Sequence, residues 1–210
     1  MFNLGYPFVM LTGVDGNGNT EILAAIIVIE ETEENYRWAF ETFVSENAEA
    51  CHNVRCIMTN KDGVCRTILS SLFSCPLYIC IFHVAQIFNR TFTYNNYGIR
   101  KAVREKCLQY CSDMMWSPTD EIYNRHYNAF MNDNSVPQDI KQYFNNNWAG
   151  ITEEWCVRFM VKGNFNNRTN NRIESLHQKL KAALGTKLTL MEFAVRFFDF
   201  LLVHQADRDH

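Results

Sequence analysis

The sequence has no apolar run of the roughly 18 residues that a membrane-spanning helix needs. Its N-terminus also lacks the basic segment and small-residue cleavage site of a secretory signal. Residues 1–50 contain a single basic residue, Arg37. No internal repeat or low-complexity tract interrupts the chain. We therefore expect an intracellular protein that is not secreted and has no membrane partner.

What is present favours a folded domain. Of the 210 residues, 47% are hydrophobic and 14% are aromatic, which is enough for a sizeable buried core. This composition excludes disorder as the main description. The chain has eight cysteines, and without an export signal most of them are expected to remain thiols.

Charge is distributed unevenly along the chain. Residues 1–50 hold nine acidic residues and one arginine, a net charge of −8. Residues 155–187 hold seven basic residues and one glutamate, a net charge of +6. A local excess of this size can hold phosphates, although a solvated helix face explains it equally well.

Two strands are predicted near the N-terminus. Residues 6–14 are apolar, and a dense turn signal over residues 15–19 separates them from the apolar run 21–29. We expect the two strands to pair as a hairpin. Because residues 21–29 do not alternate, we expect the second strand to be buried on both faces. A helix with an acidic first turn should follow Thr32.

Two further strands are predicted over residues 54–59 and 76–81, each followed by a helical pattern. The chain then looks helical to about residue 160, with helix starts at residues 117–120 and 134–137. The aromatic residues of this block have the spacing of a buried helix face, which favours packing over base stacking. They are Tyr143, Phe144, Trp148, Trp155 and Phe159.

A polar loop over residues 163–170 ends the helical block. The next helix should begin at Asn171 or Arg172 and stop at Gly185. A last apolar helix is predicted from residue 190 to about residue 204.

Four segments resemble, in the same order, the motifs of Mutator-like element (MULE) transposases. They read DGNGNTEILAAIIVIEETEENYRWAFETF, IMTNKDGVCRTIL, CPLYICIFHVAQIFNR and NNRTNNRIESLHQKLKAAL. The last block is closest to domesticated animal relatives, the zinc finger SWIM domain-containing proteins. The resemblance covers residues 5–204. It implies an α/β fold that is α+β by content. The expected architecture is a ribonuclease H-like mixed sheet that has helices on both faces and lacks its first strand, together with a helical insertion.

The resemblance also implies a division into three parts. Residues 1–99 would form the ribonuclease H-like sheet core, and residues 100–165 the helical insertion. Residues 166–210 would supply the C-terminal helices that complete the ribonuclease H-like domain.

Transposases of this family use three carboxylates around two divalent metal ions. The resemblance places the first aspartate on a strand before residue 1, the second at Asn60 and the third at Glu174. The Asn60 amide can contact a metal but brings no charge. Asp62 is expected to serve the following turn, and Glu174 also suits a capping box. We expect no intact catalytic set and no cofactor, whereas an active enzyme would need Mg²⁺ or Mn²⁺.

Cys80 and His83 match the C-x-x-H signature of the family. They could hold zinc if other residues, such as Cys51, Cys56 or Cys75, completed a tetrahedron. The alternative is that Cys80 is a buried strand residue and His83 a hydrogen-bonded residue at a helix start.

The predicted phosphate contacts lie at the polar loop and the helix after it. They are Arg168, Arg172, Lys179 and Lys181. They lead to the first functional hypothesis: a catalytically inactive, transposase-derived nuclear domain that binds DNA or chromatin proteins. The second hypothesis is a fragment of an active transposase, and the third is a decayed element without a selected role. The sequence does not predict the oligomeric state.

Overall fold

A computed structural model describes residues 6–14, 19–160, 171–185 and 188–206. The chain divides into two compact units. We call residues 1–51 with 171–210 the hairpin unit, and residues 52–170 the helical unit. No helix in the described ranges is long and apolar enough to cross a membrane.

The hairpin unit begins with two antiparallel strands, β1 (Phe8–Val14) and β2 (Thr20–Ile27). Phe8 pairs with Ile27, and a register shift lies between Leu11 and Thr12. The predicted hairpin is therefore confirmed.

Helix α1 (Glu33–Glu46) starts where the sequence predicted. The Thr32 hydroxyl accepts a hydrogen bond from the Asn35 backbone N–H at 3.2 Å, which satisfies one of the free donors of the first turn. A short helix, α2 (Ala48–His52), lies at the division between the units.

Two helices complete the hairpin unit, α11 (Asn171–Leu184) and α12 (Leu190–Ala206). Gly185, with φ +74°, ends α11, as predicted. Leu180, Leu184, Phe193 and Phe197 are buried and pack against apolar side chains of the hairpin. The Phe8 ring meets the Phe193 ring edge-on, with 5.4 Å between centroids.

The prediction that the second strand is buried on both faces is wrong. Leu23 is 55% exposed, and Ala25 is exposed as well. The core formed with α11 and α12 takes in other hairpin residues, Phe8, Met10, Ile22 and Ile27. A continuous apolar run therefore gives a strand with an exposed side.

The helical unit contains the second pair of strands, β3 (Ile57–Thr59) and β4 (Leu77–Ile79). They are parallel, and α3 (Gly63–Leu72) connects them. The described strands thus form two separate two-stranded sheets. The mixture of helices and small sheets is the α+β content that the sequence predicted.

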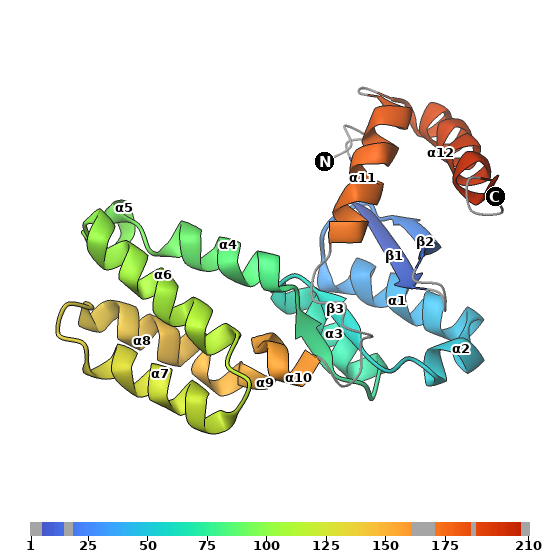
Figure 1. The fold of residues 1–210 in the computed structure, drawn as a ribbon. Helices are drawn as coiled ribbons and strands as arrows, with labels where there is room; N and C mark the ends of the chain where they lie inside the picture. The colour runs from blue at the N-terminus through green and yellow to red at the C-terminus, as the bar shows by residue number, and fades with distance from the viewer. Residues whose placement is uncertain (1–5, 15–18, 161–170, 186–187, 207–210) are drawn as a thin grey trace. The chain divides into compact units, whose positions relative to one another are not determined.

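The rest of the helical unit is a set of helices, of which α4, α6, α7 and α8 lie side by side (Figure 1). Helix α7 starts after the Thr119 cap and α8 after Pro137, at both predicted points. The bounds are α4 (Ile81–Thr91), α5 (Tyr94–Tyr97), α6 (Lys101–Met115), α7 (Asp120–Asn132), α8 (Gln138–Asn147), a 3-10 turn (Ala149–Ile151), α9 (Thr152–Trp155) and α10 (Val157–Met160).

The core of the helical unit is aromatic. Phe88 of α4 lies 4.5 Å from Trp148 between ring centroids, and Phe144 and Trp155 surround the same pair. These four side chains are almost fully buried, so the prediction that the aromatic residues serve packing is confirmed for Phe144, Trp148 and Trp155. Cys107 and Cys111 also lie in this core.

Candidate functional site

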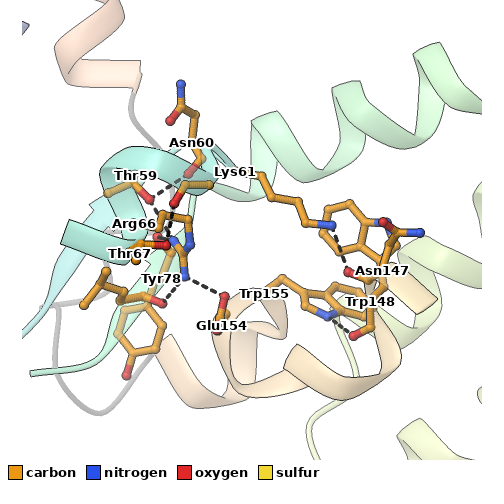
Figure 2. A network of polar contacts seen from close by, with 12 residues as sticks. Thr59, Asn60, Lys61, Arg66, Thr67, Tyr78, Asn147, Trp148, Glu154 and Trp155 are labelled. Carbon is orange, nitrogen blue, oxygen red and sulfur yellow. Dashed lines mark hydrogen bonds and ion pairs between the residues drawn. The ribbon is translucent and has the colours of Figure 1, made fainter. Parts of the chain in front are cut away.

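Asn60, where the resemblance predicts the second catalytic aspartate, lies at the end of β3. Asn60 follows the last strand residue, Thr59, and is exposed. Its backbone carbonyl accepts a hydrogen bond from the Thr59 hydroxyl at 2.7 Å. Figure 2 shows its side-chain amide pointing away from the polar network formed by its neighbours. The amide is therefore available to solvent.

Asp62 does not take the place of Asn60. Its carboxylate accepts a hydrogen bond from the Cys65 backbone N–H at 3.0 Å and caps α3. This is the structural role that the sequence predicted for it.

Cys80 and His83 lie close to the same edge of the sheet. Because β3 and β4 are parallel, their carboxyl ends meet at one edge. The Cys80 backbone N–H donates to the Thr59 carbonyl at 3.0 Å, and its side chain is fully buried at the start of α4. His83 lies in the first turn of α4 and meets the Phe82 ring edge-on.

Nowhere in the described part of the chain do three histidine, cysteine, aspartate or glutamate residues gather as a metal site would require. Of the cysteines offered as further ligands, Cys51 is buried, and Cys56 and Cys75 are partly buried. Zinc at Cys80 and His83 thus stays a prediction.

Behind Asn60 lies a network centred on Arg66 of α3 (Figure 2). The Arg66 guanidinium donates to the Thr59 hydroxyl at 2.7 Å and to the Leu77 carbonyl at 3.0 Å. It also forms an ion pair with Glu154 of α9, with 2.5 Å between Nη2 and Oε2. Arg66 thus joins both strands to the helical block.

Lys61 makes a second connection to the helical block. Its ammonium lies 3.9 Å from the centroid of the Trp148 ring and donates to the Asn147 carbonyl at 2.8 Å. Burial lowers the pKa of Lys61, an effect that the nearby Glu154 carboxylate opposes. Trp148 is itself held by Trp155, whose indole N–H donates to the Trp148 carbonyl at 3.0 Å. The ammonium of Lys61, the residue after Asn60 in the sequence, is therefore held by other groups of the protein.

Sequence reasoning missed both Lys61 and Arg66. Their partners lie 86 and 88 residues away along the chain, beyond any local pattern. One signal was present: Arg66 lies one helical turn before the buried Leu69, so it falls close to the apolar side of α3. A charge at such a position indicates a buried partner.

The structure describes two of the predicted phosphate contacts. Lys179 and Lys181 are both exposed on α11. Two residues apart on a helix, they project to opposite flanks of the buried stripe that holds Leu180.

Other predicted residues fall outside the described part. They are Arg168 and the side chains of Arg172 and Glu174. Arg158, which contributes to the basic segment, forms an ion pair with Asp120 at 2.8 Å and lies over the Tyr123 and Phe159 rings. It contributes less to a phosphate-binding surface than its charge suggests.

A family comparison adds to this geometry. Residues 2–87 match the MULE transposase domain. The MULE match runs from the start of the hairpin into α4, and it includes Asn60, Cys80 and His83. It supports a transposase-related origin for this chain. No curated protein matches the chain.

Proposed function

We propose that this chain is a ribonuclease H-like, transposase-derived domain that no longer cleaves DNA. The observation that carries the proposal is the amide of Asn60 at the end of β3, where the family resemblance places an aspartate. Two-metal cleavage depends on carboxylates that bind the ions and offset their charge. A neutral amide weakens the binding of both ions.

The neighbours of Asn60 support the same conclusion. The Asp62 carboxylate is engaged in the cap of α3. Lys61 adds a positive charge directly after Asn60, and its ammonium is held by Trp148 and Asn147. The residues at the carboxyl end of β3 therefore stabilise the fold.

We infer that the remaining role is binding to DNA or chromatin proteins in the nucleus, as a domesticated transposase domain with a scaffolding role. The exposed Lys179 and Lys181 support phosphate contact, and the predicted contacts at Arg168 and Arg172 precede them along the chain. Salt would weaken such binding, because each phosphate contact releases a counterion.

The binding test is fluorescence anisotropy of a labelled 30-base-pair DNA duplex at rising salt. The affinity should fall as salt rises, and Lys179→Glu with Lys181→Glu should weaken it further. Lys101→Glu, which changes an exposed lysine of α6, is the matched control. Affinity that is unchanged by salt and by the α11 substitutions would refute binding through phosphates.

The second candidate is a fragment of an active transposase that uses Mg²⁺ or Mn²⁺, with its first aspartate on a strand before residue 1 and Asn60 an isolated substitution. The MULE match over residues 2–87 favours it. In that case Asn60→Asp, made in a chain extended before residue 1, should give metal-dependent DNA cleavage, whereas Asn60→Ala in the same extended chain should not. Cleavage gained with Asn60→Asp in the extended chain would favour this candidate.

A further inference from the structure

Helix α12 has a second apolar face in addition to the one in the core. Phe193 and Phe197 point into the core of the hairpin unit. An exposed stripe runs along the helix beside them. We call it the α12 stripe: Met191 (75% exposed), Val195 (55%), Phe198 (64%) and Leu202 (67%).

The spacing of the α12 stripe is that of a helix-packing seam. Successive members are four, three and four residues apart, the repeat with which one helix inserts side chains between those of another. An exposed apolar surface of this kind marks an interaction site. A helix is the surface that suits this spacing.

Acidic residues lie along one side of the stripe. They are Glu192, directly after Met191, and Asp199, directly after Phe198. Both lie at the flanking positions of the seam, where pairs of opposite charge between two helices determine which partner binds. The Thr189 backbone N–H and hydroxyl both donate to the Glu192 carboxylate at 2.8 Å and lower its pKa. Glu192 thus carries a fixed negative charge at the start of the seam.

This charge pattern disfavours a second copy of the chain. In an antiparallel pair of α12 helices, the acidic side of one seam would face the acidic side of the other. In a parallel pair, Glu192 and Asp199 would face Ala194 and Leu201, which offer no opposite charge. Neither arrangement compensates the acidic residues.

The same pattern disfavours a lipid surface. Helices that lie on a membrane have lysine and arginine on their polar face. The basic residue on the polar side of α12 is Arg196, and its guanidinium donates to the Leu184 carbonyl at 2.7 Å. The Arg196 guanidinium therefore caps the carboxyl end of α11.

We propose that the α12 stripe docks an amphipathic helix of a partner protein, with apolar residues at three- and four-residue spacing and lysine or arginine at the flank that faces Glu192 and Asp199. The partner's apolar side chains pack between Met191, Val195, Phe198 and Leu202. Its basic residues pair with the two acidic residues and set its orientation.

The test uses two synthetic 21-residue helical peptides labelled with fluorescein. Both have leucine and isoleucine at the seam, but one has lysine and the other glutamate at the flanking positions. Binding to the full chain is followed by anisotropy at 50 mM salt. The lysine peptide should bind at least tenfold more tightly, and Asp199→Lys should reverse or abolish this preference.

Two exposed apolar residues of the same helix provide the matched pair of variants. Phe198→Gln lies in the stripe and should reduce lysine-peptide binding at least tenfold. Val203→Gln lies outside it and should leave binding within threefold. Circular dichroism melts should be alike for both variants.

Several outcomes would overturn the proposal. They are equal binding of the two peptides, no binding of either, or full binding by Phe198→Gln. A chain dimer in sedimentation velocity that Phe198→Gln dissociates would assign the stripe to a second copy. Vesicle binding lost in the same variant would assign it to lipid.

Discussion

The Lys61 ammonium lies over the Trp148 ring, 3.9 Å from its centroid, although 86 residues separate Lys61 from the neighbouring Asn147 that accepts its hydrogen bond. Lys61 follows directly after Asn60, so the loop at the end of β3 is anchored to the aromatic core of the helical unit. The residue after Asn60 therefore serves the fold.

Loss of this anchor should lower stability. We expect Lys61→Met to reduce the free energy of unfolding by about 1–2 kcal/mol, because it removes a cation–π contact and a hydrogen bond. Urea unfolding followed by tryptophan fluorescence measures the change. Lys101→Met, at an exposed lysine of α6, should have little effect. Equal unfolding curves for the two variants would contradict the assigned role.

The Arg66 network should be energetically coupled. Arg66→Met removes hydrogen bonds to Thr59 and Leu77 and should cost about 2–4 kcal/mol. In a double-mutant cycle with Glu154→Gln, the two changes should differ from additivity by about 1–2 kcal/mol. Additive effects would mean that the ion pair does not hold α9 to the strands.

The turn between α7 and α8 should respond to acid. Hydrogen bonds from Lys106 and then from Ser135 hold the pKa of Asp133 well below its usual value. Because the folded-state pKa is depressed, this stabilisation is complete above about pH 4 and is lost as the pH falls further.

We therefore expect the wild-type chain to lose more stability between about pH 5 and pH 3 than Asp133→Asn does. Urea unfolding at each pH gives the comparison. Asp139→Asn, at an exposed acidic residue of α8, should behave like the wild type. Parallel acid profiles for wild type and Asp133→Asn would rule out this contribution.

The buried cysteines should resist alkylation. Burial raises the pKa of Cys107 to about 11 and that of Cys156 to about 12, so few of these thiols ionise at pH 8. In the native chain iodoacetamide should label them far more slowly than the half-buried Cys65, as mass spectrometry would show. Urea should remove the difference. If Cys107 and Cys156 were labelled as fast as Cys65 in the native chain, the reagent would have access to this core.

Local structure was predictable where local chemistry decides it. Thr32 and Thr119 were predicted to start helices, and each caps one through its hydroxyl. The pairing of β1 with β2 and the end of α11 at Gly185 also follow from short-range signals. These features depend on residues within a few positions of one another.

Contacts between distant segments were not predictable. The sequence favoured burial of the second strand on both faces, whereas Leu23 is exposed. The resemblance pointed to Asn60, but the sequence did not identify Glu154 as the partner of Arg66. Such pairs depend on how the helical block folds back on the strands, which no local spacing encodes.

We propose that the chain does not cleave DNA, and a nicking assay tests this. The wild-type chain is incubated with supercoiled plasmid and Mn²⁺, and the conversion to nicked circles is followed. We expect no nicking above the level of buffer alone. Nicking that requires Mn²⁺ and disappears in Glu174→Ala would contradict it.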